Sequence, residues 1–138
     1  MSVVTKTSAT GVPAYSETLP NLPESAGTAR RLVRVALDVW HLGELTDAAE
    51  LIVTELVANA ANHVTRSAIR VTITRTGPQA VRVAVVDKSH ERPKRQQPGP
   101  TEMTGRGLAI VEAISKRWGV DMRRWGKQVW VDLEAEAS

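Results

Sequence analysis

The segment that decides the fold runs from Glu55 to His63 and reads ELVANAANH. It belongs to a longer stretch with helical periodicity, for which Thr46 is a suitable N-cap and which extends to about Val64. At about 100° per residue, the apolar and polar side chains of this stretch fall on opposing faces. The apolar face comprises Val53, Val57, Ala60 and Val64, and the polar arc comprises Glu55, Asn59, Asn62 and His63.

The two asparagines are the unusual members of this helix. Asparagine favours caps and turns over helix interiors, and a solvated helix face usually carries Lys, Glu, Gln and Arg. The helix also has Leu51 and Ile52, rather than charged residues, just upstream of the polar arc. The pattern therefore indicates a half-buried polar seam, although spacing alone leaves both a binding site and a plain solvated face open.

Two runs of alternating apolar residues follow the helix, separated by a turn at Gly77–Pro78. Two such runs across a short turn predict an antiparallel hairpin. Upstream, an amphipathic helix is predicted from about Ser25 to Gly43, preceded by a short edge strand over Tyr15–Leu19. The alternating residues are Ile69, Val71 and Ile73 in the first run and Val81, Val83 and Val85 in the second.

Residues 88–104 have no apolar period and predict a long loop, of a kind that is usually functional or disordered. A third helix follows, with Gly119 predicted as its C′ residue. Two short strands around Val120–Arg124 and Val129–Leu133 then end the pattern, with Gly126–Lys127 as their turn. The apolar stripe of the third helix is Leu108, Val111, Ile114 and Trp118.

These elements predict one α+β domain over residues 14–134. The expected architecture is a two-layer sandwich, in which a mixed, mostly antiparallel sheet of about five strands carries three helices on one face. Residues 1–13 are rich in Ser and Thr and lack any period, so they predict a flexible N-terminal tail. Residues 135–138 are expected to form a short C-terminal tail.

The composition narrows the functional classes. The chain has no cysteine, which removes disulfides and thiolate metal sites and fits a cytoplasmic location. No apolar run approaches the roughly 20 residues that span a bilayer, and the N-terminus lacks a signal core, so no membrane partner is expected. The net charge is +3. The basic residues are spread without interleaved aromatics, so a solvated basic surface is favoured over direct nucleic-acid binding.

Asp87 continues the phase of Val81, Val83 and Val85 at the end of the second hairpin strand, so its carboxylate should point toward the core. A carboxylate placed there needs strong donors or a ligand, and the exocyclic amine of a purine is one candidate. A carboxylate that only caps the following loop is the alternative.

The segment Gly105-Arg106-Gly107-Leu108 opens the third helix after the long loop. Backbone N–H groups at a helix N-terminus favour an anion, and glycine allows phosphate oxygens to approach closely. A lone Gly-x-Gly is equally compatible with a flexible loop end. Together, however, the helix seam, Asp87 and this segment provide a purine acceptor, a phosphate cradle and oxygen ligands for Mg²⁺.

In motif order and spacing over about residues 14–134, the chain resembles the Bergerat-type, histidine-kinase-like ATPase superfamily, and most of all its stand-alone anti-sigma-factor serine/threonine kinase branch. The segment Glu55–His63 resembles the N box of that superfamily. The segment Asp87–Pro93, which reads DKSHERP, resembles the adenine-binding G1 box, and Gly105–Val111, which reads GRGLAIV, resembles the G2 box.

The resemblance implies the Bergerat ATP-binding fold, with ATP and Mg²⁺ as cofactors. It implies that Glu55 is the general base, that Asn59 coordinates Mg²⁺ and that His63 lies near the phosphates. Asp87 would accept from the adenine amine. The remaining residues implied to contact the nucleotide are Asn62, Ser89, Pro93, Gly105, Arg106, Gly107, Leu108 and Gln128.

The implied function is an anti-sigma factor with serine kinase activity. Its partners would be an anti-anti-sigma antagonist as phosphoacceptor and an RNA polymerase sigma factor, and a homodimer is the implied assembly. Three positions depart from the family pattern: Ser89 and Glu91 replace glycines, and Gln128 replaces a common Thr. These departures keep open an alternative, a nucleotide-responsive module that sequesters a partner without phosphorylating it.

Overall fold

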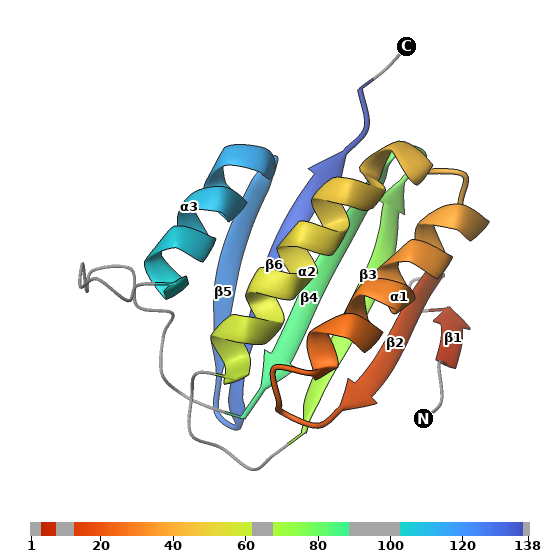
Figure 1. The fold of residues 1–138 in the computed structure, drawn as a ribbon. Helices are drawn as coiled ribbons and strands as arrows, with labels where there is room; N and C mark the ends of the chain where they lie inside the picture. Colours follow the sequence, from red (N-terminus) through yellow and green to blue (C-terminus); the bar gives the residue numbers. More distant parts are fainter. Residues whose placement is uncertain (1–3, 8–12, 62–67, 89–102, 137–138) are drawn as a thin grey trace.

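The computed structural model describes residues 4–7, 13–61, 68–88 and 103–136 (Figure 1). Three α-helices and six strands occur in these ranges, together with one short 3₁₀ helix. In chain order the elements are β1 (Val4–Thr7), β2 (Pro13–Leu19), α1 (Ser25–Val39), η1 (Gly43–Leu45), α2 (Thr46–Ala61), β3 (Ile69–Gly77), β4 (Ala80–Asp87), α3 (Met103–Ile114), β5 (Arg117–Arg123) and β6 (Gly126–Glu134).

The strands form one sheet in the order β1-β2-β3-β4-β6-β5. Each neighbouring pair of the described strands is antiparallel. The three helices lie together on one face of the sheet, and the other face is open (Figure 1). The predicted α+β sandwich with helices on one face is therefore confirmed, whereas the expectation of a mixed sheet is corrected to an antiparallel one.

The core lies between the sheet and its helices. Alternate residues of each central strand point to the helix face, because successive side chains of a strand alternate between the two faces. The buried strand residues include Leu19, Ile69, Val71, Ile73, Val81, Val83, Val85, Val129, Val131 and Leu133. The helices add Leu32, Val33, Ala36 and Leu37 from α1, Ile52, Val53, Leu56 and Val57 from α2, and Val111 from α3.

Helix α1 ends earlier than the sequence predicted. His41 has a φ of 58° and so takes the left-handed conformation that often ends a helix. The N–H of Leu42 then donates to the carbonyl of Leu37 at 2.8 Å, which satisfies a carbonyl of the last turn. Because His41 makes the reversal, the helix does not continue to Gly43.

The N-terminal prediction is corrected in two respects. Val4–Thr7, which the sequence placed in a flexible tail, forms β1 and pairs with β2. Strand β2 is consequently flanked on both sides, by β1 and β3, and is not the edge strand predicted from the sequence before Pro20 and Pro23. The sheet gains one strand over the roughly five predicted.

The predicted end of the third helix is also wrong. Helix α3 ends at Ile114, and both Trp118 and Gly119 lie in β5. Trp118 continues the helical spacing of Ile114, but it also alternates in phase with Val120, and these two side chains pack against the core. Gly119 lies opposite Trp130, where an added Cβ would come within 2.6 Å of Trp130 Cζ2. This glycine therefore makes room for an indole ring and does not cap a helix.

An ion-pair network ties together three strands on the open face. Arg82 of β4 donates two hydrogen bonds to Asp132 of β6, at 2.6 and 3.0 Å, and its guanidinium lies 4.0 Å from the centroid of the Trp130 ring. Arg117 of β5 donates to the same carboxylate at 2.7 Å. Burial alone would raise the pKa of Asp132, but the hydrogen bonds from both arginines outweigh it and lower that pKa.

Candidate functional site

Asp87 ends β4 and faces the helix side of the sheet, as its phase predicted. Its side chain is 2% exposed, and its cross-strand partner on β6 is Lys127. The Lys127 ammonium, which is fully buried, donates to Asp87 Oδ1 at 3.2 Å. Opposite charges on directly facing positions of an antiparallel pair stabilise one another. The acidic end of the hairpin is thus part of a buried ion pair that the sequence pattern did not reveal.

Gly126 makes this pairing possible through its close approach to β4. An added Cβ at Gly126 would lie 2.1 Å from the carbonyl oxygen of Asp87 and 2.7 Å from the Cα of Lys88. The φ of Gly126 is 156°, a backbone conformation that residues with a side chain rarely adopt. The turn of this hairpin is Arg124–Trp125, so Gly126 is the first residue of β6 and not the turn residue that the sequence predicted.

Gln128 lies on the open face of the sheet. It pairs with Val86 in the register of β4 and β6, and strand alternation directs it to the face opposite Asp87 and Lys127. Its predicted role in nucleotide binding stays a prediction. Lys127, one residue earlier, is the β6 side chain that supports Asp87.

Helix α2 presents the polar seam that its sequence indicated. Asn59 is buried, with 7% of its surface exposed. Its side-chain oxygen has no hydrogen-bond partner in the described part of the chain. Glu55 lies one turn earlier on the same side of the helix, is half-buried, and already has an interaction partner. A buried amide oxygen without a partner is costly, which favours a ligand at this position over a solvated face.

The Gly105–Leu108 segment lies within the first two turns of α3, which begins at Met103. The first N–H groups of a helix have no intrahelical acceptor and favour anions. Gly105 belongs to that first turn, whereas Gly107 lies in the second, so the helix starts slightly before the predicted segment. The side chains of Arg106 and Leu108 are outside the described structure.

The site elements gather at one end of the sheet. The C-terminal end of α2, the end of β4 and the β5–β6 turn lie at the same end of the molecule (Figure 1). Helix α2 packs against β4, β6 and α3, which brings the helix seam alongside the Asp87 strand. Four further predicted site residues, namely Asn62, His63, Ser89 and Pro93, lie outside the described residues.

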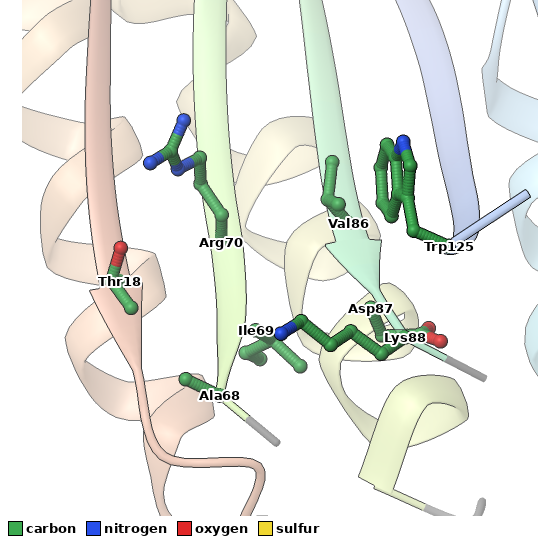
Figure 2. Close-up of a pocket in the computed structure, with 8 residues that line it drawn as sticks. All are labelled: Thr18, Ala68, Ile69, Arg70, Val86, Asp87, Lys88 and Trp125. Atoms are coloured by element: carbon green, nitrogen blue, oxygen red, sulfur yellow. The ribbon is translucent and has the colours of Figure 1, made fainter. Parts of the chain in front are cut away.

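A cavity of about 340 Å³ adjoins Asp87 on the open side of the sheet. Its lining includes Arg70, Val86, Lys88 and Trp125, and Asn59 does not contribute to it. At the end of β4, the side chains of Asp87 and Lys88 diverge, and Lys88 reaches toward the strand that carries Ile69 (Figure 2). The structure therefore brings Asp87 and Asn59 to the same end of the fold but does not join them in this cavity.

The residues present fit a magnesium nucleotide. Mg²⁺ prefers oxygen ligands and is usually held by one or two protein groups together with phosphates and water. The orphaned Oδ1 of Asn59 is one such oxygen. No group of three or more His, Cys, Asp or Glu side chains gathers to hold a metal within the described ranges. The site thus suits a cation that arrives with a phosphate ligand.

A family model for the histidine kinase-like ATPase domain matches residues 19–133. No curated protein matches the chain. No helix in the described ranges is long and apolar enough to cross a membrane. The match spans most of the chain and includes α2, the end of β4 and β6, where the buried polar groups lie. Membership in this family supports ATP binding and a general kinase or ATPase activity. On this match, the chain belongs to the histidine kinase-like ATPase domain family.

Proposed function

We propose that this chain is an anti-sigma factor that binds ATP with Mg²⁺ and phosphorylates a serine of an anti-anti-sigma partner. The observation that carries the proposal is the buried, unpartnered Oδ1 of Asn59, one helical turn from Glu55. A sigma factor would be the alternative partner, and such partners would place the protein in the cytoplasm. A homodimer is the proposed assembly.

Each described site residue has a distinct role in this proposal. Asp87 would accept a hydrogen bond from the exocyclic amine of adenine. Asn59 would supply a side-chain oxygen to Mg²⁺, which neutralises phosphate charge when it is bound. The first-turn N–H groups of α3, including that of Gly105, would face the phosphates.

The phosphoryl transfer would depend on Glu55. Transfer of a γ-phosphoryl group relies mainly on positioning and on charge neutralisation. The serine oxygen of the partner forms a bond to the γ-phosphorus while the bond to the β-phosphate oxygen breaks, which releases ADP. The serine proton passes to the Glu55 carboxylate. Glu55 is half-buried on α2, where a helix holds it in place more firmly than a loop would.

Two assays on folded protein test the proposal. Titration calorimetry with ATP and Mg²⁺ should detect binding to the wild type, and Asn59→Ala should weaken it at least tenfold. Radiolabel transfer from γ-labelled ATP to candidate anti-anti-sigma proteins should occur with the wild type. Glu55→Gln should abolish that transfer while it retains nucleotide binding. An ATP-loaded wild type that labels none of the candidates would refute the kinase role.

A second candidate is a nucleotide-responsive module that sequesters its partner without phosphorylating it. The departures at Ser89 and Glu91 favour this candidate. It predicts that partner binding changes with ATP while no label is transferred. It also predicts that Glu55→Gln leaves partner binding unchanged.

A further inference from the structure

Lys127 is the least expected residue in the core. It is the largest of the fully buried side chains in the described structure, with 0% of its surface exposed. Its neighbours along β6 on the same face are the core residues Val129 and Val131. Removing an ammonium group from water is costly, and the cost is recovered only with good geometry and further hydrogen bonds.

Stability alone does not account for this pair. Replacing a buried ion pair by apolar residues of similar volume is often neutral or stabilising. The strands around it already hold together through their ladder and through the core valines. The effect of Lys127 should therefore be sought in a group to which it donates, the carboxylate of Asp87.

We infer that Lys127 is a positioning residue that fixes the orientation of the Asp87 carboxylate and thereby selects a nucleobase with an exocyclic amine. This inference rests on the proposed ATP-binding function and adds its specificity determinant. An ionised carboxylate accepts hydrogen bonds but donates none, and its two oxygens offer about four acceptor positions. Lys127 donates to one of these oxygens, Oδ1.

The consequence is discrimination at the sixth position of a purine. The 6-amino group of adenine donates to such a carboxylate. The 6-oxo group of hypoxanthine offers only an acceptor, so two acceptors would face each other in a buried place. A mismatch at a charged hydrogen-bonding group costs affinity by roughly 10- to 100-fold. The wild type should therefore prefer ATP to inosine triphosphate by at least about tenfold.

Removal of the ammonium should relax this preference. In Lys127→Met the stem keeps a similar shape, but Asp87 loses a counter-charge at 3.2 Å. Without the Lys127 ammonium, the Asp87 carboxylate is no longer fixed in the orientation that faces the amine. The ratio of the two affinities should therefore fall at least about tenfold.

Titration calorimetry with ATP and with inosine triphosphate, both with Mg²⁺, tests the inference. The matched control is Lys116→Met, the same chemical change at an exposed ion pair with Glu134. This control should keep the wild-type ratio. Equal weakening of both nucleotides in Lys127→Met, with an unchanged ratio, would show a merely structural lysine and overturn the inference.

Two further outcomes separate this inference from the proposed function. A folded wild type that binds no ATP refutes both, whereas one that binds both nucleotides equally refutes only the role of Lys127. If Lys127→Met does not fold, the double variant Asp87→Asn with Lys127→Met removes both charges together. Its amide can present either a donor or an acceptor, so it too should lose the preference for ATP.

Discussion

Gly126 offers the sharpest test of how the fold positions Asp87. A methyl group at this position would lie 2.1 Å from the carbonyl oxygen of Asp87, where ordinary contact begins at 3.4 Å. The colliding atom belongs to the backbone, so no side-chain rotation relieves the overlap. In Gly126→Ala, the ends of β4 and β6 must therefore move apart by about 1.3 Å.

The energetic cost has two parts. Overpacking of this kind typically costs about 1–3 kcal/mol. The φ of 156° adds strain for any residue with a side chain, again of about 1–3 kcal/mol. A total of about 2–6 kcal/mol is below the stability of most domains of this size, so the variant should fold with a melting temperature lower by roughly 6–20 °C. We expect such a shift to break the 3.2 Å contact between Lys127 and Asp87.

Two other glycines supply matched controls for this prediction. Gly119→Ala places a methyl group 2.6 Å from the Trp130 ring on the open face, so it should lower stability without moving Asp87. A Cβ added at Gly43 would have no atom within 4 Å, so Gly43→Ala should change neither the stability nor the position of Asp87. We expect calorimetry at a temperature where all variants are folded to show at least tenfold weaker ATP binding in Gly126→Ala alone.

The reasoning fails if Gly126→Ala is destabilised as expected but binds ATP with wild-type affinity. That result would mean that the close approach of β6 to β4 matters for stability and not for the site. Equal loss of ATP affinity in Gly119→Ala would be just as damaging, because it would make the binding defect a general effect of destabilisation.

Three further predictions concern stability. Burial raises the pKa of Glu17, only partly offset by Arg31, so the folded state prefers the protonated acid and stability is lost as the pH rises from about 4.5. Glu17→Gln should therefore raise the melting temperature at pH 7 and have little effect on it below pH 4. An equal stabilising effect at both pH values would contradict this prediction. The pKa of Asp132 is lowered in the folded state, so its ion-pair network stabilises the fold at pH values above the pKa of Asp132 in the unfolded chain. This stabilisation is lost as the pH falls through the pKa of Asp132 in the folded state. Asp132→Asn should cost about 1–2 kcal/mol at neutral pH by denaturant titration, with a smaller loss near pH 3, because an exposed arginine limits the gain. Asn59→Leu should raise the melting temperature by several degrees and abolish magnesium-dependent ATP binding, since it removes a buried orphan oxygen.

The elements that depend on a single periodicity could be predicted from the sequence. The hairpin of β3 and β4 follows from strict alternation, and α2 follows from a face of Val53 and Val57 that lies fully in the core. The end of α3 could not be predicted, because Trp118 satisfies both the helical and the strand period. What decides between them is the fit of Gly119 under Trp130, a contact with a residue eleven positions later.

The candidate site was predictable only in part, for a similar reason. Asp87 and Asn59 could be found because a polar residue in an apolar pattern is visible along the chain. Lys127 could not, since a lysine after a glycine reads as a solvated turn until β6 is paired with β4. The register that turns Lys127 inward also turns Gln128 outward, and the sequence alone does not show which residue begins the strand.

The buried polar groups themselves point to the site, independently of the family match. In the register of the sheet, Leu19, Ile69, Asp87 and Lys127 form one row, and Glu17 lies in the adjacent row on the same face. The orphaned amide of Asn21 follows directly after that end of β2. Selection for stability alone gives no reason for buried polar side chains to cluster. These side chains nevertheless lie together where β2, β4 and α2 end. Departures from local rules that collect at one end of a fold are expected where a ligand recovers their cost.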